Sequence, residues 1–241
     1  MLEDLSQCVW PPPWTPSHVD AVLEVLDRLA GQEVPPNTPG AAAAILTPET
    51  GASRLRYTSA ETSASRLRYA SAETSASRLR YASAVTGWAY VAEDVVRLLS
   101  LVLCTRAWLD RALPTLIDAA DPRLLDGTAL LHTDVRSDNL CFRDGATVLV
   151  DWNHTSVGNP EIDVASWLPS LHLEGGPAPH EVAPHATPGI AAHVAGYSAS
   201  RAGLPAPPRA PLVRHIQRRQ LEVALPWAAA LLDLPPPDGA A

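Results

Sequence analysis

Hydrophobic side chains recur at helical spacing near the start of the chain. Ser17 is a typical cap at the beginning of a helix, and Gly31 is a typical stop at its end. The positions between them that share one side are Val19, Val22, Leu23, Leu26 and Leu29. This pattern predicts an amphipathic helix over residues 17–30 whose apolar side packs into the core.

A longer apolar pattern runs from Trp88 to Ala112 and predicts one continuous helix, ended by Pro114 because proline cannot continue a helix. Further on, Asn159 and Pro160 are typical of a helix start and predict a helix through Trp167. The remaining predicted segments are a surface loop over residues 173–188 and helices over residues 190–202 and 211–234, the last one kinked or divided by Pro226.

Short apolar runs between these helices predict strands. Ala129 to Leu131 forms one such run, and the runs over residues 139–142 and 147–152 are joined by Arg143-Asp144-Gly145-Ala146. The dipeptide Asp-Gly is a strong signal for a hairpin turn. The sequence therefore predicts a mainly helical α+β fold with a small β-hairpin.

Three near-identical units of 12 residues occupy Thr50 to Val85: TGASRLRYTSAE, TSASRLRYASAE and TSASRLRYASAV. They contain six Arg against two Glu, and the interleaved Tyr side chains would allow nucleic-acid binding by stacking and charge. Their Ser and Ala content favours the simpler interpretation, a low-complexity insert. Deleting one unit should then change the thermal stability little.

Composition narrows the class of protein. With 241 residues and 46% hydrophobic content, the chain can bury a core. Its three cysteines are odd in number and show no paired spacing, which favours a reducing, cytoplasmic location. The longest apolar run, residues 98–104, is too short to cross a membrane. A net charge of −8 argues against a general nucleic-acid binder and suits a cationic or neutral substrate.

Polar residues concentrate in HTDVRSDN, residues 132–139, and at the end of VLVDW, residues 148–152. Transfer of a phosphoryl group needs an acid that accepts or orients the proton of the nucleophile, a cation against the developing charge, and oxygen ligands for Mg²⁺. Asp134 and Arg136 can supply the first two. Asn139 and Asp151 can supply the ligands if the hairpin brings them together.

These motifs resemble the aminoglycoside phosphotransferase and choline kinase-like family, relatives of the protein kinases. The family pattern is His-x-Asp-x-x-x-x-Asn, followed by an Asp that ends a strand. The resemblance implies that Asp134 is the catalytic base and that Asn139 and Asp151 are metal ligands. It places Arg136 where protein kinases keep a lysine that contacts the transferred phosphate.

The same resemblance implies supporting roles for two more residues. His132 would fix the loop, and Asp163, in the segment GNPEIDVA, would anchor it. Met1 to Leu5 resembles the hinge between the two lobes of the family, so that backbone groups around Glu3 and Leu5 would face the adenine of ATP.

The implied fold is the C-terminal lobe of a protein-kinase-like enzyme. Residues 1–49 would form its hinge-like start and first helix, residues 50–85 the insert, and residues 86–241 the remainder with the catalytic loop and the acceptor-pocket helices. The chain contains no lysine, and a Gly-rich phosphate loop is not found in it. We therefore expect that the N-terminal lobe is missing and that the chain alone has very low kinase activity.

The implied reaction moves the γ-phosphate of ATP, or of another nucleoside triphosphate, to a hydroxyl of a small, aminoglycoside-like molecule with the help of Mg²⁺. Candidate contacts for an amine-bearing acceptor are Glu174, Glu181 and Glu222. No nucleic acid and no membrane is expected as a partner.

Three alternatives stay open at this stage. The polar residues could serve turn formation only, since Asp, Asn and Ser favour turns. The chain could be a truncated, pseudokinase-like binding protein that keeps the loop without catalysis. A metal-dependent hydrolase would instead use His132, Asp134, Asp151 and His154 as ligands for zinc or manganese.

Overall fold

The computed structural model describes residues 5–41 and 87–238, so that Glu3 and the repeats of residues 50–85 lie outside the described residues. The helices are α1 (Pro16–Ala30), α5 (Gly87–Glu93), α6 (Val95–Leu99), α7 (Arg106–Ala119), α8 (Glu161–Leu173), α9 (Pro179–Val182), α10 (Pro188–Ala202) and α11 (Val213–Leu231). Two 3₁₀ helices are η1 (Pro122–Leu125) and η2 (Trp152–His154). The strands are β1 (Ala129–Leu131), β2 (Leu140–Arg143), β3 (Ala146–Leu149) and β4 (Ser156–Gly158).

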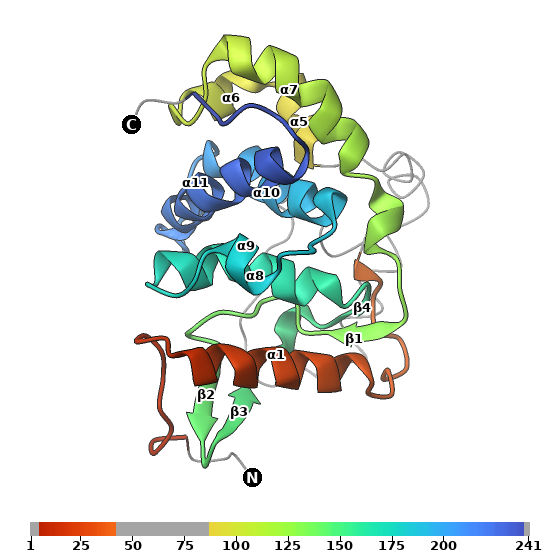
Figure 1. The fold of residues 1–241 in the computed structure, drawn as a ribbon, viewed down its shortest axis with the longest axis vertical. Coiled ribbons are helices and arrows are strands. Elements are labelled where there is room, and N and C mark those ends of the chain that lie inside the picture. Colours follow the sequence, from red (N-terminus) through yellow and green to blue (C-terminus); the bar gives the residue numbers. More distant parts are fainter. Residues whose placement is uncertain (1–4, 42–86, 239–241) are drawn as a thin grey trace.

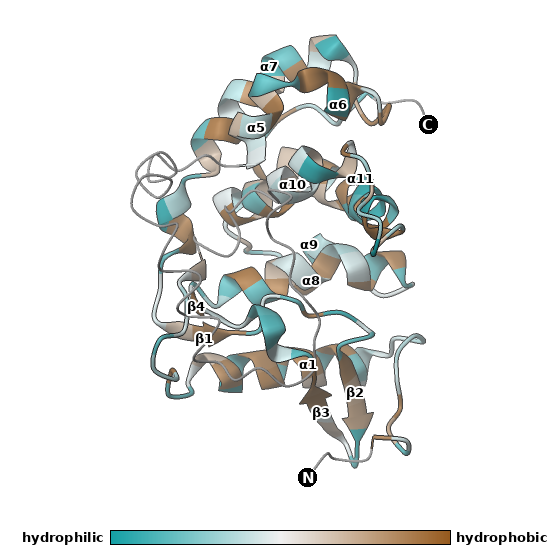
Figure 2. Ribbon diagram, turned by 180° about the vertical axis from the view of Figure 1, so that it is seen from behind, coloured by the Kyte–Doolittle hydropathy of each residue, from teal (hydrophilic) through white to brown (hydrophobic). Residues whose placement is uncertain are grey.

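The helices are stacked in layers (Figure 1). At one end lie α5, α6 and α7, followed by α10 and α11, then by α8 and α9, and finally by α1 with the β2–β3 hairpin at the other end. The helices α1, α7 and α11 each carry both apolar and polar residues (Figure 2), as expected of helices with one buried side. Large side chains fill the core between layers, including the fully buried Trp88, Trp108 and Trp167.

Helix α1 forms where the sequence predicts it, but its cap differs from the prediction. The hydroxyl oxygen of Thr15 accepts a hydrogen bond from the backbone N–H of His18 at 3.2 Å, so Thr15, and not Ser17, caps the helix. Pro16 then occupies the first turn, where its missing N–H costs nothing. Gly31 follows the last turn as predicted.

The prediction of one continuous helix from Trp88 to Ala112 is wrong, because the chain breaks it into α5, α6 and α7. Asp94 leaves the helical conformation at φ −147° and ψ 79°, and Val102 has a left-handed φ of 58°. Thr105 starts a new helix, since its hydroxyl accepts a hydrogen bond from the N–H of Trp108 at 3.1 Å. Pro114 lies inside α7 and does not end it.

A glycine contact holds α5 against α10. A Cβ atom on Gly87 would collide with the carbonyl of Gly196, so both backbones approach more closely than larger residues allow. Beside this contact, the indole N–H of Trp88 donates a hydrogen bond to the carbonyl of Ala192 at 2.8 Å. The layer of α5 therefore fixes the position of α10.

The described strands form two antiparallel pairs, β1 with β4 and β2 with β3. The predicted hairpin is confirmed: Leu140 pairs with Leu149, and the turn residues Asp144 and Gly145 have positive φ values of 52° and 79°. Two consecutive positive φ values are typical of the type I′ turn that Asp-Gly favours. The pairing of β1 with β4 was not predicted.

The later helices largely match the predicted ranges. Helix α8 runs beyond Trp167 to Leu173, and the side-chain oxygen of Asn159 accepts from the N–H of Glu161 at 3.0 Å at its start. The predicted loop over residues 173–188 contains the short helix α9. Among the described residues, none of the helices combines the length and hydrophobicity that a membrane crossing requires.

Candidate active site

The start of the polar loop is attached to α8 through one carboxylate. The backbone N–H of His132 donates to Oδ2 of Asp163 at 2.8 Å, and that of Thr133 donates to Oδ1 at 2.6 Å. Burial raises the pKa of Asp163 above its usual value, while these two hydrogen bonds and the neighbouring His132 act in the opposite direction. Because both oxygens are used, Asp163 fixes the position and the direction of the loop.

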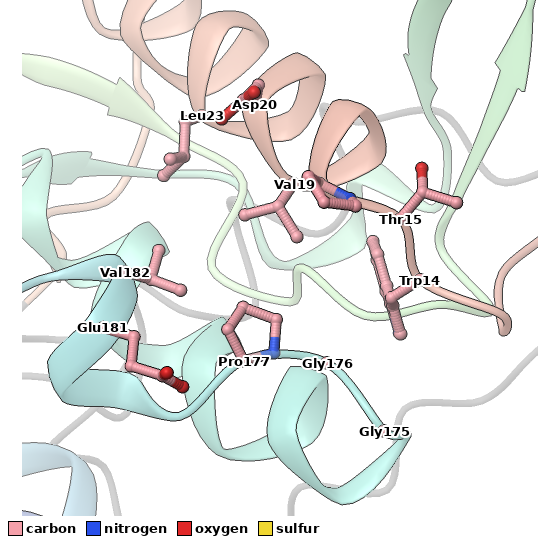
Figure 3. A pocket seen from close by; sticks show the side chains of 11 residues that line it. Trp14, Thr15, Val19, Asp20, Leu23, Gly175, Gly176, Pro177, Glu181 and Val182 are labelled. Carbon is pink, nitrogen blue, oxygen red and sulfur yellow. The ribbon is translucent and has the colours of Figure 1, made fainter.

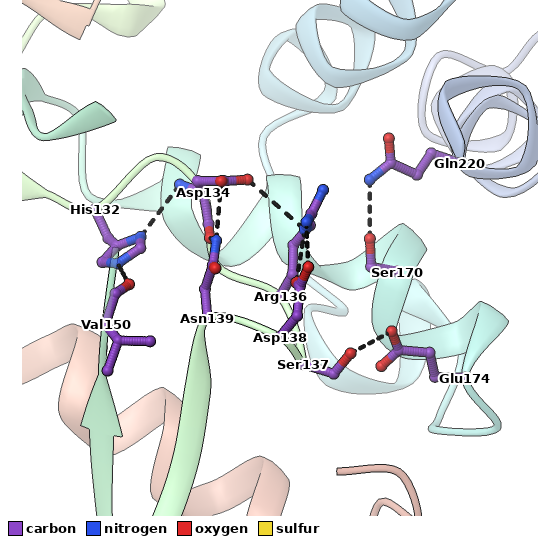
Figure 4. Close-up of polar contacts among 10 residues, drawn as sticks. All are labelled: His132, Asp134, Arg136, Ser137, Asp138, Asn139, Val150, Ser170, Glu174 and Gln220. Carbon is purple, nitrogen blue, oxygen red and sulfur yellow. Dashed lines mark hydrogen bonds and ion pairs between the residues drawn. The ribbon is translucent and has the colours of Figure 1, made fainter. Parts of the chain in front are cut away.

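The His132 ring joins the loop to the end of β3 (Figure 4). Its Nδ1 atom faces the N–H of Asp134 at 3.3 Å, and its Nε2 atom faces the carbonyl of Val150 at 2.8 Å. Because Nδ1 accepts, the proton sits on Nε2, which donates to the carbonyl. The ring is fully buried and meets the edge of Trp152 at a centroid distance of 4.7 Å. This geometry fits the loop-fixing role predicted for His132.

Asn139 orients Asp134. Its amide nitrogen donates to the backbone carbonyl of Asp134 at 2.8 Å and to Oδ2 of the same residue at 2.9 Å. The N–H of Asn139 also donates to the carbonyl of Arg136 at 2.9 Å, which closes the loop. Since both side-chain bonds use the amide nitrogen, the amide oxygen of Asn139 is the atom left to act as a metal ligand.

Arg136 places a positive charge beside Asp134. Its Nε atom lies 3.9 Å from Oδ1 of Asp134 and donates to Asp138 at 3.0 Å, and a second guanidinium nitrogen donates to the other oxygen of Asp138 (Figure 4). Burial alone lowers the pKa of Arg136, but the hydrogen bond to Asp138 and the charges of both carboxylates outweigh it and raise the pKa. The guanidinium therefore stays charged next to the carboxylate.

Asp151 lies directly beyond the strand end that faces Asn139. The N–H of Val150 donates to the backbone carbonyl of Asn139 at 2.9 Å, so the two strand ends are adjacent. Asp151 itself has a left-handed backbone, with φ 60° and ψ 61°, and its exposed carboxylate accepts from the amide of Asn153. A carboxylate and an amide oxygen are donors that Mg²⁺ takes. The residue types present therefore suit a metal site, while the convergence of the two side chains on one ion stays a prediction.

The ligand set of the hydrolase hypothesis is not assembled. Within residues 5–41 and 87–238, no group of three or more His, Cys, Asp or Glu side chains is placed to hold a metal ion. Both ring nitrogens of His132 already face backbone groups, which removes the first of the four residues that this hypothesis needs.

A cavity of about 360 Å³ lies beside the loop. One side is formed by Thr133, Asp134 and Arg136, and the other by residues of α8, α10 and α11 that include His193, Tyr197 and Gln220. The sequence motifs point to the loop side only. The helix side contains no sequence motif. The only sequence signal for it is the prediction that these segments are helices.

None of the three glutamates predicted to contact an acceptor lines this cavity, and Glu181 lines a second cavity instead. Their contact with an acceptor stays a prediction. Glu174 accepts hydrogen bonds from the hydroxyl of Ser137 at 2.6 Å and from the indole of Trp14 at 2.9 Å. Glu181 accepts from the N–H of Ala178 at 2.6 Å at the start of α9. Glu222 pairs with arginines of its own helix, Arg218 and Arg219.

A second cavity, of about 350 Å³, lies between α1 and the segment of residues 175–182 (Figure 3). Trp14, Val19 and Val182 line it, and none of the predicted catalytic or metal-binding residues does. The cavity beside Asp134 is therefore the candidate active site.

The segment predicted to face adenine runs along the hairpin. Val9 and Phe142 exchange two backbone hydrogen bonds of 2.9 Å, so the segment around Val9 pairs with β2 through one antiparallel bridge. The carbonyl of Leu5 accepts from the N–H of Cys8 at 3.0 Å and closes a turn. The contact of Leu5 with adenine stays a prediction.

Comparison with known proteins agrees with this site. The model of the phosphotransferase enzyme family matches residues 66–202, which is more than half of the chain and includes the loop, the hairpin and α8. No curated protein and no solved structure gave a match. The chain belongs to the phosphotransferase enzyme family, as its resemblance to aminoglycoside phosphotransferases and choline kinase-like proteins implied.

Proposed function

We propose that this chain carries the catalytic loop and the acceptor cavity of a kinase that transfers the γ-phosphate of ATP to a hydroxyl group of a small molecule. The observation that carries the proposal is the Asp134 carboxylate, held by Asn139 at 2.9 Å and exposed to a cavity of about 360 Å³. The described helices and hairpin would then correspond to the C-terminal lobe of a protein-kinase-like enzyme.

In the proposed step, the acceptor oxygen forms a bond to the γ-phosphorus. The bond between that phosphorus and the oxygen bridging to the β-phosphate breaks, and ADP leaves with the electron pair. The acceptor proton passes to the carboxylate of Asp134, the acid that faces the cavity. Arg136, 3.9 Å from Asp134, stabilises negative charge that develops on the phosphoryl oxygens.

The metal ligands of this proposal are the amide oxygen of Asn139 and the carboxylate of Asp151. Bound Mg²⁺ would neutralise charge on the phosphate oxygens of the nucleotide. The hydrogen bonds from Asn139 to Asp134 tie this ligand to the base, so that the position of one residue fixes the other.

The proposal is tested by titration with Mn²⁺ in the presence of ATP, with Mn²⁺ as a paramagnetic substitute for Mg²⁺. Asp151→Asn should weaken Mn²⁺ binding by at least about tenfold, since even supporting residues of metal sites are worth that much. Asp144→Asn is the matched control, because it removes the same charge at the hairpin turn, where the left-handed φ of 52° suits Asn. An unchanged affinity in Asp151→Asn would remove the metal assignment.

A further inference from the structure

Few charged side chains line the cavity beside Asp134. Among the described residues that line it, Asp134 is the sole carboxylate and Arg136 the sole guanidinium, 3.9 Å apart, and Arg136 also pairs with Asp138 outside the lining. Two histidines, His154 and His193, line the cavity as well. Burial lowers the pKa of His193, and its Nε2 atom faces the carbonyl of Asp121 at 2.9 Å. His193 is therefore neutral near pH 7 and leaves the charge of the wall unchanged.

The helix side of the cavity is largely apolar. Tyr197 and Ile216 border it and are 36% and 37% exposed, so part of their apolar surface is accessible. The guanidinium of Arg201 lies 4.0 Å from the centroid of the Tyr197 ring and holds it in place. Further apolar lining residues are Ile162, Pro169, Ile190, Val194 and Val213. Such a wall favours a ligand with an apolar surface of its own.

The polar groups of the helix side are neutral. Ser198, Gln217 and Gln220 line the cavity, and the amide of Gln220 donates to the hydroxyl of Ser170 at 2.9 Å (Figure 4). Arg214 donates to the side-chain oxygen of Gln217 at 2.9 Å. Amides and hydroxyls can orient a hydroxylated ligand by hydrogen bonds, but they give no counter-charge to an ammonium group.

We propose that the acceptor is an uncharged small molecule that presents its hydroxyl on a partly apolar body, and that the cavity disfavours polyamines such as aminoglycosides. This inference rests on the proposed function, which assigns the acceptor to this cavity. An ammonium group would lose its hydration on entry and would find Asp134 as its partner. That contact would occupy the carboxylate that must accept the proton. The volume of about 360 Å³ lies at the low end for ligand sites and selects small acceptors.

The test compares pairs of compounds that differ in one group, such as hexyl glucoside and its 2-amino-2-deoxy counterpart. Affinities for the full chain are measured by ligand-observed NMR without ATP. The neutral member should bind at least about tenfold more tightly, and its affinity should change little with salt. Equal or tighter binding of the ammonium member across the panel, or no binding of any neutral member, would overturn the inference.

A variant with an added negative charge tests the same inference from the side of the protein. Gln220→Glu adds a carboxylate to the wall, and the Ser170 hydroxyl can still donate to it, so the fold should be preserved. The preference should shift towards the ammonium member by about tenfold. Gln32→Glu is the matched control, because Gln32 is exposed beyond the end of α1 and does not line the cavity. A shift of the same size in both variants would contradict a local effect.

The two proposals can fail separately. Binding is measured without transfer, so a neutral preference with no phosphoryl transfer would contradict the proposed function alone. Transfer to a polyamine through Asp134, with ammonium members bound more tightly, would contradict the neutral acceptor alone.

Discussion

The two walls of the candidate active-site cavity, a loop wall with Thr133, Asp134 and Arg136 and a helix wall from α8, α10 and α11, are built in different ways. On the loop wall, the polar groups are tied to one another: His132 and Thr133 to Asp163, and Asn139 to Asp134. On the helix wall, the lining is apolar or neutral, and Tyr197 and Ile216 remain partly exposed. Phosphoryl transfer requires catalytic side chains in fixed positions, whereas ligand binding requires a cavity surface that is complementary to the ligand. We therefore expect substitutions on the loop wall to change turnover and those on the helix wall to change affinity.

The largest effect in this comparison should come from Asp163→Ala, which releases the loop wall. The buried N–H of His132 and the partly buried N–H of Thr133 would lose their acceptor, which should cost about 3 kcal/mol of unfolding free energy. Displacement of the loop should also lower turnover by about 100-fold. Urea denaturation and steady-state kinetics measure the two effects. Asp118→Ala, at an exposed position of α7, is the control, and equal stability of both variants would contradict the anchoring role.

A smaller effect is expected from Val194→Ala on the helix wall. The substitution removes two methyl groups from the cavity lining, and at about 0.8 kcal/mol per buried group the acceptor affinity should fall by roughly 15-fold at most. Turnover at saturating acceptor should stay the same, because the loop wall is untouched. Steady-state kinetics with varied acceptor separates the two quantities. A lower turnover with unchanged affinity would contradict the division between the walls.

The smallest effect concerns the pH dependence of stability. Because burial lowers the pKa of His193, the folded state keeps this side chain neutral, while the unfolded state takes up a proton below about pH 6.5. The unfolded state then binds more protons, so the unfolding free energy should decrease as the pH falls through that range. His193→Gln should show a weaker decrease in denaturation experiments at pH 8 and pH 5.5. An identical decrease in both proteins would show that His193 does not contribute.

Local signals in the sequence were sufficient for the β-hairpin, because Asp144 and Gly145 determine the turn by their own backbone preferences. They were not sufficient for residues 88–112. The apolar pattern there continues across Asp94 and Val102, and the breaks depend on how α5 and α7 pack against other layers. The pairing of β1 with β4 is also a long-range contact that periodicity does not reveal.

The candidate site also contains residues that local sequence signals indicate and residues that they do not. Asp134, Asn139 and Asp151 could be proposed as site residues because their spacing is set by one loop and one hairpin. The helix wall could not, since Tyr197, Ile216 and Gln220 are ordinary helix residues whose common cavity exists only after α10 and α11 pack together. Net charge does not locate the site: the chain is acidic, but Glu174, Glu181 and Glu222 form hydrogen bonds or ion pairs outside the cavity beside Asp134.

Phosphoryl transfer by Asp134→Asn tests whether Asp134 is the base of a phosphotransferase. The variant removes the proton acceptor but keeps an oxygen that can accept the hydrogen bond from Asn139. Because the chain alone is expected to turn over slowly, formation of the phosphate ester from a neutral acceptor and Mg²⁺-ATP is followed by phosphorus NMR under single-turnover conditions with excess protein. The rate in Asp134→Asn should be about 100- to 10,000-fold below that of the unmodified chain, while acceptor affinity is retained. Equal rates of ester formation in the two proteins would contradict the account.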